Sequence, residues 1–135
     1  MARARHLLAE AGFPNGFATS LETRRGQTYE DDAIFIENAL RNIGVTTKVN
    51  LLESAAYFEV SANGDFNMLY TSLATSFNDP DAYYAELWAC DSVRNNARYC
   101  DPELDALYLK QSSTLDQAER RRLVNELERK MLDSE

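Results

Sequence analysis

The segment between Lys48 and Arg94 combines acidic and aromatic side chains and contains no lysine or arginine. Its acids and rings are Glu53, Tyr57, Phe58, Glu59, Asp65, Phe66, Tyr70, Phe77, Asp79, Asp81, Tyr83, Tyr84, Glu86, Trp88 and Asp91. Carboxylates beside aromatic rings suit cationic or neutral polar ligands, because the rings pack against the ligand while the acids accept from its donors. A solvated acidic face above an aromatic core would give the same composition, so both interpretations stand.

The sequence contains no complete catalytic set. Its one histidine, His6, lies in a charged amino-terminal segment, whereas nucleophilic triads place a histidine beside the nucleophile. The glycine-rich phosphate loops and the GxSxG elbow are also missing. Asp79 and Asp81 offer paired carboxylates for acid–base chemistry, but Asp79 directly precedes Pro80, which is typical of a helix cap. We therefore expect a protein that is not an enzyme.

The two cysteines, Cys90 and Cys100, are separated by nine residues and form no CxxC pair. A zinc site would need more cysteine or histidine ligands than this sequence offers, so we expect no metal and no cofactor. The cysteines are either two buried free thiols or a disulfide that closes a small loop. A disulfide requires an oxidising compartment, and the residues alone leave both possibilities open.

The 135 residues carry 22 acidic and 14 basic side chains, which gives a net charge of −8. This length fits a single domain. A negative surface repels phosphate backbones and anionic lipids, so we expect no nucleic-acid partner and no membrane insertion. The apolar stretch behind the basic start, residues 7–9, is too short for a signal peptide. The chain is therefore expected to be either cytosolic or a piece of a longer protein.

Alternating and β-branched patterns predict an α/β fold with three strands, at residues 17–23, 45–52 and 66–73. Helices are predicted between the strands, with Thr28 as the cap of the second helix and Gly44 as its stop signal. A β-α-β-α-β order implies a mainly parallel three-stranded sheet with the first strand in the centre. A further helix is predicted before the first strand, at residues 4–11.

The carboxyl-terminal part is predicted to be helical. Two Asp-Pro pairs, Asp79-Pro80 and Asp101-Pro102, each open a helix, and the second of these runs to about Ser112. The last helix spans residues 115–132 and carries an apolar stripe of Leu123, Val124, Leu127 and Met131.

Ligands of parallel sheets bind outside the carboxyl ends of the strands. In this sequence those ends are the loops after Thr23, Leu52 and Leu73. The third loop combines hydroxyl, aromatic, amide and acid groups, as polar ligand pockets do. Its residues, and the predicted ligand-binding site, are Thr75, Ser76, Phe77, Asn78 and Asp79. The alternative is that these side chains only make turn hydrogen bonds and cap the following helix.

Six short elements of the sequence, in order, resemble those of family 5 extracellular solute-binding proteins. Residues 4–17 resemble "LLxEAGyxxGf", residues 36–45 "iqxxLxxiGI", residues 65–68 the "yDm" strand, residues 79–81 the "DP" loop, residues 96–107 "NxxxYxnPelDxLl" and residues 116–123 "dxxeRxxly". The resemblance covers nearly the whole chain.

The resemblance implies that this chain is the carboxyl-terminal lobe of a longer, two-lobed protein with a periplasmic-binding-protein-like fold. Such a protein captures a peptide or peptide-like solute between its lobes and delivers it to the permease of an ABC importer. The partners would be the solute, the other lobe and the permease. The parent protein would be periplasmic or extracellular, and Cys90 and Cys100 would then form a disulfide.

One position departs from the family pattern. Several peptide-binding members place an aspartate, which pairs with the ligand's α-ammonium group, where this sequence has Ser76. A serine accepts a hydrogen bond but cannot neutralise an ammonium group. Modified peptides, other peptide-like solutes and other ligand classes therefore remain open.

Two other classes of protein are compatible with the same elements. A small cytosolic flavodoxin-like regulator or enzyme would share the sheet topology, but it should carry a catalytic or phosphate-binding loop after a strand. A helical interaction adaptor would use the apolar stripe of residues 115–132 and would leave that stripe exposed.

Overall fold

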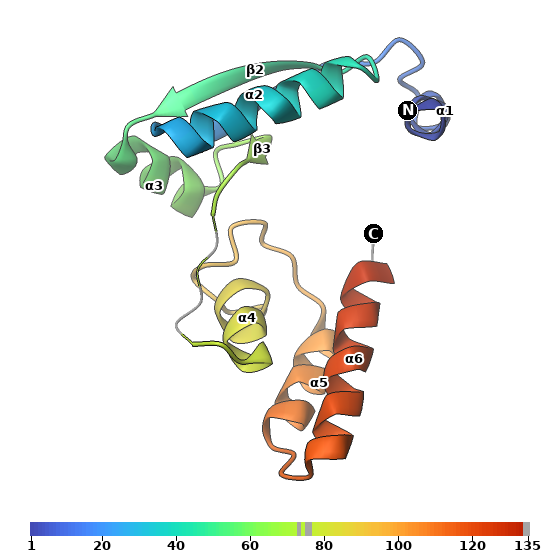
Figure 1. The fold of residues 1–135 in the computed structure, drawn as a ribbon, viewed down its shortest axis with the longest axis vertical. Coiled ribbons are helices and arrows are strands. Elements are labelled where there is room, and N and C mark those ends of the chain that lie inside the picture. Colours follow the sequence, from blue (N-terminus) through green and yellow to red (C-terminus); the bar gives the residue numbers. More distant parts are fainter. Residues whose placement is uncertain (73, 75–76, 134–135) are drawn as a thin grey trace. The chain divides into compact units, whose positions relative to one another are not determined.

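The computed structural model describes residues 1–72, 74 and 77–133. The chain folds as two compact units, residues 1–72 and residues 73–135 (Figure 1). The first unit holds all three strands and the first three helices, and the second unit holds the last three helices. That both units form a single domain of a longer protein stays a prediction.

The first unit is built on a parallel sheet of β1 (Ala18–Arg24), β2 (Thr46–Leu52) and β3 (Met68–Leu69). The strand order is β2-β1-β3, and β1 pairs in parallel with both neighbours. The prediction of a parallel sheet with the first strand in the centre is therefore confirmed.

The third strand is shorter than the predicted span of residues 66–73, because only Met68 and Leu69 pair with β1. After them, Tyr70 still donates its N–H to the carbonyl of Glu22. The carbonyl of Tyr70, however, accepts from the Thr23 hydroxyl at 3.0 Å, so a side chain replaces the next ladder bond. Leu73 lies outside the described residues.

The helices of the first unit are α1 (Ala2–Glu10), α2 (Gln27–Arg41) and α3 (Ser54–Asn63), and α2 and α3 both contact β1 and β2. The prediction that Thr28 caps α2 is wrong. Gly26 is the N-cap, and its N–H donates to the Glu30 carboxylate at 3.2 Å, so a residue inside the first turn closes the helix end. The helix ends at Arg41, and Gly44, at φ +97°, lets Val45 donate back to Leu40.

Two glycines bring the amino ends of β1 and β2 together. Gly16 has a φ of +75°, and a Cβ built on it would lie 1.9 Å from the carbonyl oxygen of Gly44. Beside this contact, Thr46 donates its N–H to the carbonyl of Phe17 at 2.8 Å. The turn after α1 and the turn after α2 therefore pack backbone against backbone, which leaves no room for a side chain at Gly16.

The second unit contains α4 (Pro80–Leu87), α5 (Pro102–Ser112) and α6 (Gln117–Asp133). Both predicted Asp-Pro starts are confirmed. Asp79 accepts from the N–H of Asp81 at 3.0 Å, and Asp101 accepts from the N–H of Glu103 at 2.8 Å.

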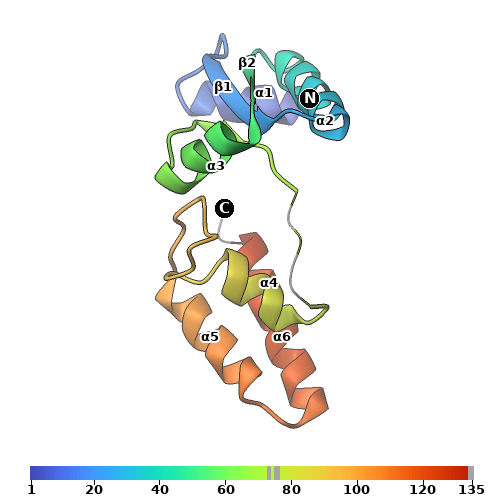
Figure 2. The same ribbon diagram turned by 90° about the vertical axis from the view of Figure 1, so that its left-hand side faces the viewer.

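α5 and α6 run antiparallel and lie side by side, as the two views show (Figure 2). Leu123 and Leu127 of the apolar stripe are buried at 1% and 4% exposure, and Leu104 of α5 is buried at 1%. A helical adaptor requires the stripe to be exposed, so burial of these leucines contradicts that hypothesis. The stripe builds the core of this unit instead.

Candidate functional site

The carboxyl edge of the sheet gathers polar side chains that are distant in sequence. β1 ends at Arg24, β2 at Leu52 and β3 at Leu69. Because the strands are parallel, these ends meet at one edge, where parallel sheets bind their ligands. The side chains that interact there are Arg24, Tyr29, Asp32, Tyr70 and Ser72.

Arg24 and Tyr29 form the first contact of this edge. The guanidinium Nη2 donates to the Tyr29 hydroxyl at 2.7 Å, and its Cζ lies 4.7 Å from the centroid of the Tyr29 ring. The Tyr29 and Ser72 hydroxyls are 2.9 Å apart, and the hydrogen bond to Ser72, together with Arg24, lowers the pKa of Tyr29. Among the described residues, no carboxylate lies within ion-pair distance of Arg24.

Tyr70 and Asp32 form the second contact. The Tyr70 hydroxyl donates to Asp32 Oδ2 at 2.5 Å, and this hydrogen bond raises the pKa of Tyr70. The rings of Tyr29 and Tyr70 meet edge to face with their centroids 6.3 Å apart. The edge therefore carries a guanidinium, a carboxylate that accepts from Tyr70, two phenols and a hydroxyl, and its guanidinium suits a polar solute that carries a carboxylate.

The strand order predicted a ligand region at this edge, but the side chains that form it were not predicted. A ligand region was expected after Thr23, but neither Arg24 nor Arg25 was among the predicted site residues. The available signal was a cation directly after a strand that ends at the ligand edge. Tyr29 and Ser72 gave no such signal, because they interact across 43 residues of sequence.

The predicted loop site is described only in part. Thr75 and Ser76 lie outside the described residues. Phe77 and Asn78 are exposed, with Phe77 at 56% exposure. The assignment of residues 75–79 to ligand binding stays a prediction.

Asp79 is committed to contacts within its own unit. Besides capping α4, it accepts from Arg120 Nη2 on Oδ1 at 2.6 Å and from Nη1 on Oδ2 at 3.2 Å. The bonds from Arg120 and from the Asp81 backbone lower the pKa of Asp79. A carboxylate already neutralised by a guanidinium is a weak partner for a ligand's ammonium group. In this structure Asp79 caps α4 and pairs with Arg120.

An apolar groove of about 420 Å³ begins beside this loop and runs between α4 and α6. Asn78 and Asp79 lie at its polar end. Its apolar walls include Tyr83, Trp88, Val124, Leu127, Met131 and Leu132.

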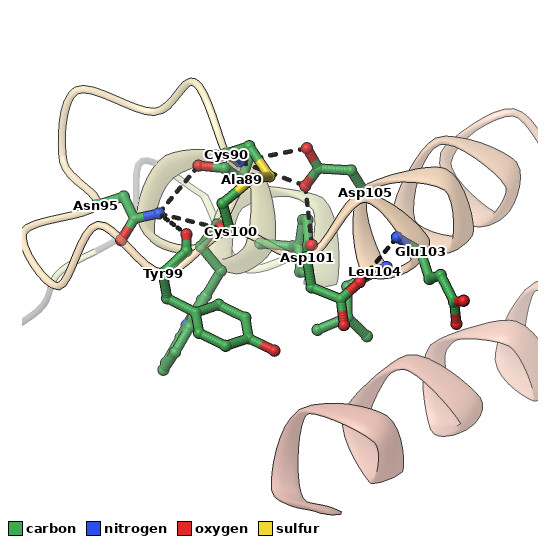
Figure 3. Close-up of a disulfide and its surroundings, with 11 residues drawn as sticks. Ala89, Cys90, Asn95, Tyr99, Cys100, Asp101, Glu103, Leu104 and Asp105 are labelled. Atoms are coloured by element: carbon green, nitrogen blue, oxygen red, sulfur yellow. Dashed lines mark hydrogen bonds between the residues drawn. A yellow bond between two sulfur atoms is a disulfide. The ribbon is translucent and has the colours of Figure 1, made fainter. Parts of the chain in front are cut away.

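A disulfide joins Cys90 to Cys100 and closes the loop between α4 and α5 (Figure 3). Asn95 lies inside this loop and its amide donates to the carbonyls of Trp88, Ala89 and Tyr99, at 2.6 Å for Tyr99. From α5, Asp105 accepts from the Tyr84 hydroxyl at 2.9 Å and from the N–H of Cys90. The pKa of Tyr84 is raised, mainly because the hydroxyl is buried and also because it donates to Asp105.

The part of the chain that the structure describes contains no cluster of three or more histidine, cysteine, aspartate or glutamate side chains that could hold a metal ion. Among the same residues, no helix is long and apolar enough to cross a membrane.

The parallel sheet and its helices have the fold of part of the solute-binding proteins on which they superpose. The sequence profile of bacterial extracellular solute-binding proteins, family 5 Middle, matches residues 1–95, and the chain belongs to this family. Membership in a family of solute-binding proteins fits a binding protein better than the flavodoxin-like regulator or enzyme.

The chain is similar to several proteins of this kind. It is 29% identical over 140 residues to the glutathione-binding protein GsiB of Pectobacterium atrosepticum, a match that covers 96% of this chain and 27% of GsiB. The periplasmic binding protein DppA from Helicobacter pylori, in complex with peptide STSA, superposes with a TM-score of 0.84 at 29% identity, over 93% of this chain and 25% of DppA.

The dipeptide-binding protein from Pseudoalteromonas sp. SM9913, in complex with Met-Leu, also superposes with a TM-score of 0.84, at 26% identity over 93% of this chain and 26% of that protein. The chain therefore spans about a quarter of the length of the relatives that it matches.

Proposed function

We propose that this chain is part of the substrate-binding component of an ABC importer, and that it contributes one lobe to a longer two-lobed receptor. The receptor captures a peptide or peptide-like solute between its lobes and delivers it to the permease, in the periplasm or outside the cell. Family membership supports this role, as do relatives named for glutathione, peptide and dipeptide binding. The receptor catalyses no reaction.

The observation that carries the proposal is the half-buried guanidinium of Arg24 at the carboxyl edge of β1. It lies beside the Tyr29 hydroxyl and has no carboxylate partner among the described residues. A solute carboxylate placed there would gain a charge-assisted hydrogen bond. Peptides and glutathione all carry such a group, so we assign Arg24 to solute carboxylate binding.

The second contact region is the predicted loop of Thr75, Ser76, Phe77, Asn78 and Asp79. Phe77 offers an exposed ring and Asn78 an exposed amide for a polar solute. Asp79 is held by Arg120, and Ser76 carries no charge, so this loop offers no unpaired acid to an ammonium group. We therefore expect a solute whose free amino group contributes little to affinity.

The mechanism is differential affinity of two receptor conformations. A solute that binds the closed form better than the open form shifts the population toward closure, and the permease recognises the closed form. The contact between the solute carboxylate and Arg24 contributes to this shift to the extent that it is stronger in the closed form than in the open form.

Calorimetric titration of the full-length protein that contains this chain tests the proposal. The solutes are glutathione and a series of di- to tetrapeptides, each also with an acetylated amino group or an amidated carboxyl group. We expect binding of at least one peptide-like solute, a loss of about tenfold or more in affinity on amidation, and little change on acetylation. Binding of none of them would contradict the peptide class.

Residue substitutions test the loop. For the solute that binds most tightly, Ser76→Ala and Phe77→Ala should each weaken binding by about fivefold or more, through a lost hydrogen bond or lost aromatic packing. If both variants fold normally and bind as well as the wild type, the loop is not a contact region. The isolated 135-residue chain should bind weakly or not at all, because closure of the other lobe would supply much of the burial.

A further inference from the structure

A polar network joins the start of α4 to α5 and α6 in the second unit. Arg120 of α6 holds both carboxylate oxygens of Asp79, and its Nε donates to Gln111 Oε1 at 3.2 Å. Gln111 in turn donates to Asp81 Oδ1, and the Ser112 hydroxyl donates to Asp81 Oδ2 at 2.8 Å.

The network has one defined geometry because its central side chain is fully buried. Gln111 is 0% exposed and uses its amide both to accept from Arg120 and to donate to Asp81. A buried amide without partners is strongly unfavourable, so these two contacts are maintained together. The planar guanidinium adds a second constraint, because it binds the two oxygens of Asp79 at once.

Asp79 is the last residue of the loop and the N-cap of α4, so the network fixes the point where the loop joins the helix. On the other side of the loop, Arg94 Nη2 donates to the carbonyl of Ala74 at 2.9 Å and pairs with Glu86. Guanidinium groups from two other segments therefore hold Ala74 and Asp79.

We infer that Arg120 is a positioning residue for solute binding: it fixes Asp79, and thereby the orientation in which Phe77 and Asn78 are presented, without contacting the solute. This inference rests on the proposed role of Phe77 and Asn78 in solute binding. It assigns a function to a side chain that is remote in sequence from the loop and is turned toward Asp79 and Gln111.

The experiment uses the full-length protein with Arg120→Gln, Arg120→Lys and a control, Arg122→Gln. Arg122 lies on the same helix, but its ion-pair partners among the described residues are Glu119 and Glu126 of that helix, outside the network. Hydrogen exchange of the Asp81 and Ala82 amides, measured without solute, reports how firmly the start of α4 is held. Calorimetry with the tightest peptide or glutathione from the panel gives Kd at a temperature where every variant is folded.

We expect Arg120→Gln to speed exchange of these amides about tenfold and to raise Kd about tenfold. Arg120→Lys, which keeps the charge but not the two-point contact, should recover part of both effects. Arg122→Gln should leave both measurements unchanged. The lysine variant also preserves a test if Arg120→Gln does not fold.

One outcome would overturn the inference directly: Arg120→Gln speeds amide exchange but leaves Kd unchanged, although Phe77→Ala weakens binding. Arg120 would then stabilise the start of α4 without affecting solute binding. Unchanged exchange in both Arg120 variants would overturn it as well. An unchanged Kd in Phe77→Ala and in both Arg120 variants would instead show that the loop is not a contact region, which ends the proposed role of the loop and this inference together.

Discussion

The two units hold their candidate contact regions in different ways. In the first unit, Arg24 stands on a seven-residue strand that is paired along its length with β2, and two glycines fix the register with a backbone contact. In the second unit, Asp79 and Ala74, which precede α4, are held by side chains of α6 and of the disulfide loop. The first arrangement is sensitive to backbone changes, and the second is sensitive to losses of individual side chains.

The largest effect is expected from the glycine contact. Gly16→Ala should lower the free energy of unfolding by about 3 kcal/mol or more, because a left-handed backbone costs an alanine roughly 1–2 kcal/mol and its Cβ would also overlap the Gly44 carbonyl. Gly12→Ala is the matched control, since Gly12 also has a positive φ but has no atom within 4 Å of a built Cβ. Chemical denaturation measures both, and equal losses would show that the close approach is unimportant.

The disulfide is expected to have the next largest effect. Replacing Cys90 and Cys100 together by alanine should lower the free energy of unfolding by about 2–3 kcal/mol in the chain-entropy model, and faster hydrogen exchange should appear in α4 and α5 but not in β1. Alkylation followed by mass spectrometry checks the native bond. Two freely alkylated thiols in protein from an oxidising compartment would contradict it.

The smallest effect concerns the pH dependence of the Asp79–Arg120 pair. The pKa of Asp79 in the folded protein lies below the ordinary value of 3.8. The pair therefore stabilises the fold fully above pH 3.8, and this stabilisation is lost as the pH falls through the folded-state pKa. Both side chains are about one-third exposed, at 33% and 31%, so solvent screening limits the contribution to about 1 kcal/mol or less. The free energy of unfolding of wild type and of Asp79→Asn is measured from about pH 5 to about pH 2.5, the range in which carboxyl groups titrate. The two curves of free energy against pH should converge at low pH. Parallel curves would show that the pair contributes nothing.

What the sequence predicted correctly depends on local signals. The apolar-polar alternation of residues 17–23, the β-branched run of residues 45–52 and the two Asp-Pro pairs are patterns of neighbouring residues, and the structure confirms the two strands and the two helix starts that they predicted. Thr28 carried a capping signal as well, but the Glu30 carboxylate closes that helix end from inside the first turn.

The side chains around the candidate contact regions could not be predicted in the same way. The Tyr29–Ser72 contact spans 43 residues and the Arg120–Asp79 contact spans 41. Their formation depends on how strands and helices pack, and no local pattern encodes a partner at that distance. Such distant contacts occur in both units, because Tyr29 and Ser72 belong to the first and Arg120 and Asp79 to the second.

The most direct test of the central claim is a thermodynamic cycle between Arg24 and the solute carboxylate in the full-length protein. Kd is measured by calorimetry for a tight-binding peptide and for its carboxyl-amidated form, in wild type, in Arg24→Gln and in the control Arg41→Gln. The side chain of Arg41 contacts Glu37 and Asn38 of its own helix, α2, within the described part of the chain. The account predicts that amidation weakens binding about tenfold or more in wild type and in Arg41→Gln, and has little effect in Arg24→Gln, where the carboxylate has already lost its partner. The same loss on amidation in all three proteins would contradict the assignment of Arg24 and of the carboxyl edge of the sheet to solute binding.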